Sequence, residues 1–242
     1  MRLIHTADWH LGKHIEGHSR LEEQELFLED FVNIVKERDA DVVLIAGDIY
    51  DSSNPPAKAE QLFYDTLKKI SDGGRRLTIV IAGNHDNPDR LVSATPLAME
   101  HGIIMVGTPK TVIPKGQYGS WKVCRSGEGY IKIERKSEQA VVLTVPFPSE
   151  KRLEEVLYSE MESEEIQLET YRLADQFEEE TVNIIVSHLF VMDSLEEGSE
   201  RSIQLGGSYL ADPDIFPKLA DYVALGHIHR PQSVPGHPNI RY

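Results

Sequence analysis

The sequence is poor in cysteine and has no long apolar run. Its 242 residues include one cysteine, Cys124, which excludes an internal disulfide and a structural zinc site built on thiolates. No apolar run reaches the roughly 18 residues that a membrane-spanning helix needs. The N-terminus lacks the charged head and apolar stretch of a signal peptide. These absences predict a cytoplasmic protein that does not enter a membrane.

Positive charge is also scarce. The chain has 25 Lys and Arg against 40 Asp and Glu, for a net charge of −15, whereas nucleic-acid-binding proteins usually carry a basic footprint. The acidity is concentrated, because residues 150–180 hold twelve acids and three bases while residues 110–136 hold seven bases and two acids. Net charge therefore does not exclude a local phosphate site, where bound divalent cations would add positive charge.

Apolar runs with the pattern of strands recur along the chain, and helical patterns fall between the early ones. Strands are expected at 2–6, 42–46, 77–82, 103–106, 140–145, 182–187 and 222–225. Amphipathic spacing predicts helices at 21–38, 57–71 and 91–101, with hairpins within 107–133 and one or two exposed helices within 149–180. The alternation favours an α/β fold with parallel pairing. No linker marks a second domain, so residues 1–242 are expected to form one.

Side chains of metal-binding type follow five of the expected strands. They are Asp8-Trp9-His10, Gly47-Asp48-Ile49-Tyr50-Asp51, Gly83-Asn84-His85-Asp86, Ser187-His188 and Gly226-His227-Ile228-His229. Ligands bind beyond the carboxyl ends of strands in α/β sheets, so these groups are expected to meet at one edge. An isolated histidine at such a position is more often a hydrogen-bonded polar residue than a ligand. Five such groups in order favour a metal site.

The donor types narrow the chemistry. Imidazole, carboxylate and amide groups suit manganese, iron or zinc in an open catalytic site. They are too many for one ion, whereas two ions that share a bridging carboxylate would use them all. Two neighbouring ions can hold the attacking and leaving oxygens of an in-line phosphoryl displacement. The glycines at 47, 83 and 226 are expected to let the backbone turn sharply beside the ions.

The first three motifs, with Leu11-Gly12 and Pro55-Pro56 beside them, resemble the calcineurin-like metallophosphoesterase superfamily. Within it they are similar to the bacterial SbcD nuclease subunits and their archaeal and eukaryotic break-repair relatives. The resemblance implies two facing mixed β-sheets flanked by helices, a four-layer sandwich. It implies two divalent metal ions, most simply Mn²⁺. One would bind Asp8, His10, Asp48 and His229, and the other Asp48, Asn84, His188 and His227.

The resemblance also implies catalytic roles. His85 would donate a proton to the leaving oxygen or hold the scissile phosphate. Archaeal and eukaryotic relatives have a histidine where this chain has Asp51, whereas phosphatases of the superfamily have an aspartate. The hypothesis is that Asp51 hydrogen-bonds His85 and keeps it cationic, so that Asp51→Asn lowers turnover with metal content intact. Asp86 is expected to have a structural role.

The implied function is that of a manganese-dependent DNA nuclease in repair, recombination and replication. It would act as a 3′-to-5′ exonuclease on double-stranded ends and as an endonuclease on single strands and hairpins. Implied partners are DNA, an SbcC-type coiled-coil ATPase and a second copy of the chain, through helices 57–71 and 91–101. The resemblance implies that family members continue into a DNA-capping domain and an ATPase-binding segment, which are expected to lie beyond these 242 residues. The alternatives are a phosphatase or cyclic-nucleotide phosphodiesterase, and a catalytically inactive scaffold.

Four basic residues are further candidates for contact with DNA phosphate, namely His14, His18, Arg20 and Arg90. Trp9 lies between two expected ligands. It could stack on a base, but packing beneath the site is the favoured interpretation.

Overall fold

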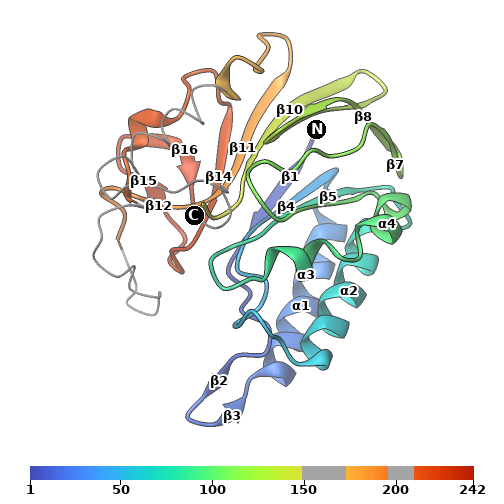
Figure 1. Cartoon of the computed structure of the whole chain (residues 1–242), viewed down its shortest axis with the longest axis vertical. Coiled ribbons are helices and arrows are strands. Elements are labelled where there is room, and N and C mark those ends of the chain that lie inside the picture. The colour runs from blue at the N-terminus through green and yellow to red at the C-terminus, as the bar shows by residue number, and fades with distance from the viewer. Residues whose placement is uncertain (149–172, 196–209) are drawn as a thin grey trace.

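Two β-sheets face each other in the computed structural model, which describes residues 1–148, 173–195 and 210–242 (Figure 1). The first sheet has the order β1-β4-β5-β6 and is parallel throughout these strands. The second sheet has the order β15-β16-β14-β11-β10-β9-β8-β7 and is mixed. Two small ribbons, β2-β3 and β12-β13, complete the strands. The expected α/β fold with two facing sheets is confirmed, and the mixed pairing belongs to the second sheet.

The strands of the first sheet are β1 (Leu3–Thr6), β4 (Val42–Ala46), β5 (Leu77–Ile81) and β6 (Ile103–Val106). Those of the second sheet are β7 (Gly116–Tyr118), β8 (Trp121–Gly127), β9 (Tyr130–Arg135), β10 (Glu138–Val145), β11 (Val182–His188), β14 (Tyr222–Gly226), β15 (Ser233–Val234) and β16 (His237–Arg241). The ribbons are β2 (His14–Ile15) with β3 (His18–Ser19), and β12 (Phe190–Val191) with β13 (Leu210–Ala211). All seven strands expected from apolar runs are present, and the hairpins expected within 107–133 are β7, β8 and β9.

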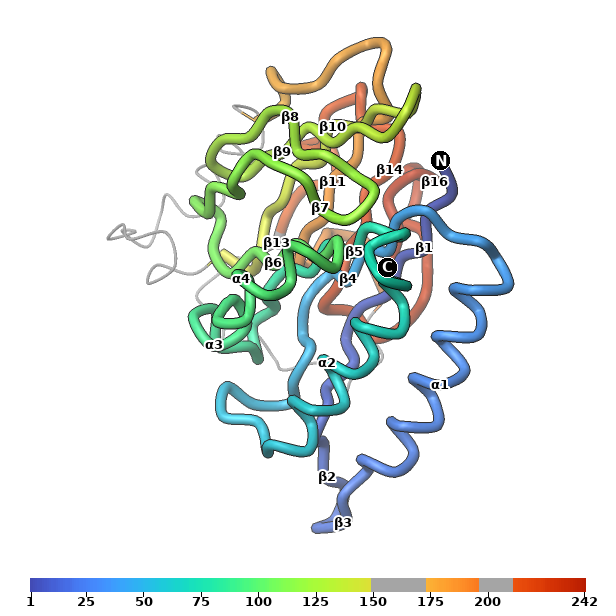
Figure 2. Tube along the Cα trace, turned by 90° about the vertical axis from the view of Figure 1, so that its right-hand side faces the viewer, coloured from blue at the N-terminus to red at the C-terminus, as the bar shows by residue number. Residues whose placement is uncertain are grey.

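The long helices α1 (Leu21–Glu37) and α2 (Ala57–Ser71) pack side by side on the outer face of the first sheet (Figures 1 and 2). Their buried stripes, which include Phe31 and Phe63, join one side of β4 and β5 in an apolar core. Burying such a stripe stabilises the fold by about 25 cal/mol for each Å² of apolar surface removed from water. Both helices confirm the amphipathic spacing of the sequence.

The prediction of one continuous helix at 91–101 is wrong. Residues 88–101 form α3 (Pro88–Val92), α4 (Thr95–Ala98) and the 3₁₀ turn η1 (Met99–His101). Pro96 lies in the first turn of α4. Because proline lacks an N–H and disfavours helical geometry in the residue before it, the helix stops and begins again.

Two further apolar cores hold the sheets in place. One lies between the facing sheets and includes Leu44, Ile79 and Trp121. The other covers the outer face of the second sheet with residues from β12 and from around the 3₁₀ turn η2 (Pro213–Ile215). Within the described ranges no helix has the length and apolarity to cross a membrane. Residues 149–172, where most of the expected exposed helices fall, lie outside the described part.

Candidate metal centre

All seven expected ligands converge at one edge of the two sheets, because parallel strands end there. Residues 7–12 follow β1 and residues 47–51 follow β4, and the main-chain N–H groups of Asp8 and His10 donate to the carbonyls of Gly47 and Asp48 at 3.0 Å each. In the second sheet, parallel pairing of β11 with β14 sets His188 opposite Gly226. Groups from both ends of the chain therefore meet.

Four of these ligands have left-handed backbone conformations. The φ angles are 57° at Asp8, 45° at His10, 50° at Asp48 and 102° at His227. Such geometry costs a non-glycine residue about 1–3 kcal/mol and persists where surrounding structure enforces it, typically at functional sites. The local sequence did not reveal this feature.

The three expected glycines allow close approaches at the centre, Gly47 and Gly226 between the two sheets and Gly83 against Asp48 of its own sheet. An added Cβ would lie 2.3 Å from His188 Nδ1 at Gly47, 2.1 Å from Asp48 Oδ1 at Gly83, and 1.9 Å from the Ala46 oxygen at Gly226. Only Gly47 of the three has a positive φ, at +89°. The expected sharp turn is therefore found at Gly47, whereas Gly83 and Gly226 are required because a side chain has no room.

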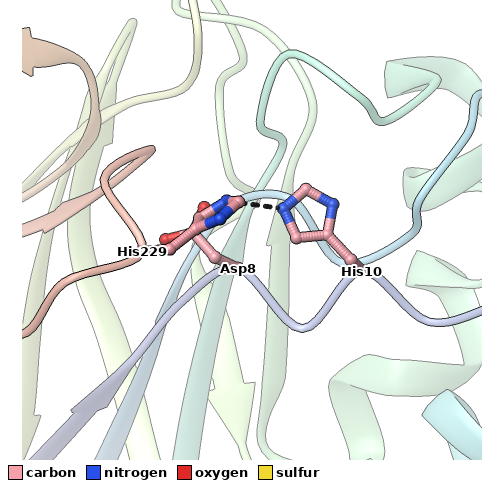
Figure 3. A group of neighbouring side chains, drawn as sticks. All are labelled: Asp8, His10 and His229. Carbon is pink, nitrogen blue, oxygen red and sulfur yellow. Dashed lines mark hydrogen bonds between the residues drawn. The ribbon is translucent and has the colours of Figure 1, made fainter. Parts of the chain in front are cut away.

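Asp8, His10 and His229 form the first ligand group, with their ligand atoms all within 4.8 Å of one another (Figure 3). His10 Nε2 and His229 Nε2 lie 3.0 Å apart. Two nitrogens bound to one ion at about 2.1 Å and a right angle would have about this separation. The group therefore fits a divalent transition-metal ion.

Asp48, His188 and His227 form the second ligand group. Asn84 belongs with them, because its Oδ1 lies 2.9 Å from His188 Nε2 and 3.0 Å from His227 Nδ1. An amide oxygen among imidazoles and a carboxylate is a donor set that suits manganese, iron or zinc.

Asp48 joins the two groups. Its Oδ2 lies 3.5 Å from His188 Nε2 in the second group and 3.7 Å from His10 Nε2 in the first. Its Oδ1 instead accepts a hydrogen bond from the main-chain N–H of His85, at 2.8 Å. One oxygen is thus held by the protein while the other faces both groups, as a bridging carboxylate requires.

Hydrogen bonds behind the ligands fix their orientation. His188 Nδ1 donates to the Ala46 carbonyl at 2.8 Å, which leaves Nε2 to face the site. Asp8 accepts from the main-chain N–H of His227. Asp86, expected to be structural, is buried and accepts from the main-chain N–H groups of Gly83, Ile49 and Tyr50. Such outer contacts hold metal ligands in place and raise the basicity of imidazole.

Burial and charge shift the ionisation of these groups before any ion is bound. Burial raises the pKa of Asp8 to about 7, against the opposing charge of His188. Burial lowers the pKa of His10 to about 3, although Asp48 opposes this. Burial would lower the pKa of His188 too, but the Asp48 carboxylate outweighs it and raises the pKa to about 9. Burial likewise acts to raise the pKa of Asp48, but neighbouring histidines, His188 first, hold it well below its usual range. The metal-free centre thus contains a buried Asp48–His188 ion pair.

His85 lies beside the ligand groups, with its ring centroid 4.6 Å from that of His10. Its Nδ1 donates to the main-chain carbonyl of Asp51 at 2.7 Å, and its Nε2 lies 3.9 Å from Asp48 Oδ2. The Asp51 carboxylate instead points toward His10, with Oδ1 3.7 Å from His10 Nδ1. That nitrogen is buried and has no hydrogen-bond partner among the described residues. The hydrogen bond from His85 to Asp51 therefore runs to the main chain and not to the hypothesised carboxylate, which lies within 4.8 Å of ring nitrogens of both His10 and His85.

Other residues singled out in the sequence have varied surroundings. Trp9 is buried, donates to Thr6 Oγ1 at 2.9 Å, and packs edge-on against Phe31, as the packing interpretation requires. Arg90 is occupied by a bidentate contact with Glu60, which leaves it a poor phosphate ligand. His14, His18 and Arg20 lie in or beside the exposed β2–β3 ribbon.

Two phenylalanines beside the centre were missed in the sequence. The ring of Phe147 contacts that of His188, and the ring of Phe190 contacts that of His227. Both follow the ends of strands that lead to the site, and this position was the available signal.

A family model for calcineurin-like phosphoesterases matches residues 1–231. The chain belongs to this family. Two curated relatives are similar to this chain. The first is the SbcD subunit of the nuclease SbcCD from Bacillus subtilis (strain 168), which is 42% identical over 243 residues. The match covers 97% of this chain and 58% of the relative. The protein of the same name from Rhodobacter capsulatus is 34% identical over 255 residues, covering 100% of this chain and 61% of the relative. The chain thus spans about three fifths of the length of these relatives.

Among solved structures, the phosphopantetheinyl hydrolase PptH of Mycobacterium tuberculosis aligns over 99% of this chain and 86% of its own, with 13% identity and a TM-score of 0.44. This likeness is too low to bear on fold or function.

Proposed function

We propose that residues 1–242 are the nuclease domain of an SbcD-type, two-metal DNA phosphodiesterase. The observation that carries the proposal is the position of Asp48 Oδ2 between two ligand groups. Asp8, His10, Asp48 and His229 would hold one ion, and Asp48, Asn84, His188 and His227 the other. Mn²⁺ is the proposed metal, and the names of the two relatives support a nuclease.

When bound, the two ions would supply Lewis-acid activation of the attacking water and neutralise charge on the phosphate. The protein groups prepare the centre for them. Asp48 and the oriented imidazoles set the spacing of the two binding positions, and the hydrogen bond from His188 to Ala46 keeps Nε2 directed inward. These contacts are formed before substrate arrives, so no reorganisation is needed in the transition state.

His85 is the proposed general acid. Its Nδ1 is committed to the Asp51 carbonyl, so Nε2 is the atom that faces the centre. A proton on Nε2 could pass to the leaving oxygen of the cleaved strand. Asp51 positions this ring through its main chain, and its carboxylate contributes negative charge beside His10.

A comparison of substrates tests the proposal. With Mn²⁺ supplied, we expect release of nucleotides from duplex DNA ends and nicking of single-stranded circles, with much slower turnover of a phosphomonoester. His85→Ala should reduce DNA cleavage by about 10²–10⁴-fold, the usual contribution of a general acid, while it retains both metal ions. Fast hydrolysis of monoesters without DNA cleavage would instead identify a phosphatase. Failure to bind Mn²⁺ would support the inactive scaffold.

The proposal extends to partners and location. DNA is the proposed substrate, an SbcC-type ATPase and a second copy are the proposed protein partners, and the cytoplasm is the proposed location. Leu97 of α4 is 77% exposed, which suits a contact between copies through α2 and the segment after it. Light scattering on the wild type and on Leu97→Lys tests the dimer: we expect the variant to shift the protein to a monomer.

A further inference from the structure

We propose that Phe147 and Phe190, the phenylalanine pair, bind nucleobases next to the scissile phosphate. This inference rests on the proposed nuclease function and adds a base-binding subsite to it. The pair flanks the second ligand group: Phe147 lies two residues after the end of β10, and Phe190 begins β12, two residues after the expected ligand His188.

The ring contacts place each phenylalanine beside one expected ligand of the second group. The Phe147 ring centroid lies 6.2 Å from that of His188, with the planes at 77°. The His188 and His227 centroids are 5.3 Å apart, and the Phe190 centroid is 6.3 Å from that of His227 at 45°. A phosphate bound at the second ligand group would therefore have two aromatic rings near it, one beside each of these histidines.

Burial separates the pair from ordinary core residues. Leu189 and Val191, the neighbours of Phe190 in the chain, are 1% and 0% exposed and belong to the core over the second sheet. Phe147 and Phe190 are partly exposed, and neither belongs to the three apolar cores of the described residues. Trp9 shows the opposite arrangement, because it is also next to ligands but is packed into the core. Core packing therefore does not explain why phenyl rings border a polar metal centre.

Nucleobases are the ligand class that fits these rings. Every base has a flat π-face, so stacking on an aromatic side chain tolerates any sequence. Stacking also needs no positive charge, which suits a chain with a net charge of −15. A base inside a duplex is already stacked on both faces, so the pair would select bases at frayed ends, in loops or in single strands.

A matched pair of substrates tests the subsite. One is a single-stranded oligonucleotide, and the other has abasic residues on both sides of the cleaved bond. With Mn²⁺, we expect Phe190→Leu and Phe147→Leu each to raise KM for the normal oligonucleotide by about 5- to 100-fold, the range for loss of one base–aromatic stack. On the abasic substrate we expect the variants and the wild type to have equal KM, because the base contact is already absent.

Controls keep the test decisive. Phe27→Leu removes a phenyl ring that is 50% exposed on α1, away from the centre, and should leave both KM values unchanged. Phe190→Trp should restore tight binding of the normal oligonucleotide. Unchanged KM in both leucine variants, or equal losses on the two substrates, would overturn the inference. Wild-type protein that cleaves neither oligonucleotide would instead overturn the nuclease function itself.

Discussion

A methyl group at Gly83 would collide with Asp48, the proposed bridging carboxylate. The added Cβ would lie 2.1 Å from Asp48 Oδ1 and 2.2 Å from the Asp48 nitrogen. Normal contact needs about 3.4 Å, so Asp48 must move by roughly 1 Å. That shift would break the 2.8 Å hydrogen bond from the His85 N–H to Oδ1.

The expected cost follows from these contacts. Overpacking of a tight interior costs about 1–3 kcal/mol, and loss of a hydrogen bond to a charged group adds about 1.5–3 kcal/mol. We therefore expect Gly83→Ala to lower the free energy of unfolding by about 2.5–6 kcal/mol. Oδ1 moves together with the rest of the carboxylate, including the Oδ2 atom that faces both ligand groups, so binding of both ions should weaken by at least the 10- to 100-fold typical of disturbed supporting contacts.

Calorimetric titration with Mn²⁺ and metal analysis after dialysis measure the effect, and denaturant unfolding measures stability. The control is Gly17→Ala at the tip of the β2–β3 ribbon, where an added Cβ meets nothing within 4 Å and only the φ of +82° opposes it. We expect this control to cost about 1–2 kcal/mol and to leave Mn²⁺ binding intact. Wild-type Mn²⁺ affinity in Gly83→Ala would refute the reasoning that Asp48 has no room to move.

The remaining predictions concern the Asp51 carboxylate and the dependence of stability and Mn²⁺ affinity on pH. Asp51→Asn keeps the hydrogen bond from His85 to the main-chain carbonyl but removes the negative charge that faces His10, so we expect Mn²⁺ to bind about tenfold more weakly. Unaltered Mn²⁺ binding with a loss of turnover would show instead that the carboxylate acts on His85. The raised pKa of Asp8, about 7, stabilises the protonated folded protein, and this contribution is lost between about pH 4 and 7; the raised pKa of His188, about 9, gives a contribution that is lost between about pH 6.5 and 9. Metal-free stability should therefore fall as pH rises from about 6.5 to 9, where His188 titrates. Metal binding must displace the His188 proton, so Mn²⁺ affinity should rise over the same pH range. Binding should also release a proton, and this release should disappear above about pH 9. Calorimetric titration in several buffers measures it. A pH-independent affinity would contradict this.

The strands and the two long helices could be predicted because extended apolar patterns in the sequence determine them. Buried strands such as β4 are uninterrupted apolar runs, and parallel strands bring their carboxyl ends to one edge, so the meeting of the five motifs followed from strand order, whereas the assignment of seven ligands came from the family resemblance. The continuous helix expected at 91–101 was wrong, because the apolar spacing runs past Pro96 whereas the helical backbone is interrupted before it. Contacts between distant segments carry no local signal. The approach of Gly226 to Ala46, the direction of the Asp51 carboxylate and the exposure of Phe190 therefore emerged only from the structure.

The first ligand group takes Asp8 and His10 from the beginning of the chain and His229 from near its end, 219 residues after His10. A ribosome therefore releases the two early ligands long before it makes the third. Until β14 has been synthesised and has paired with β11, a nascent polypeptide lacks the groups that close either ion-binding position. The order of translation thus delays completion of both proposed ion-binding positions until most of the two sheets has been made.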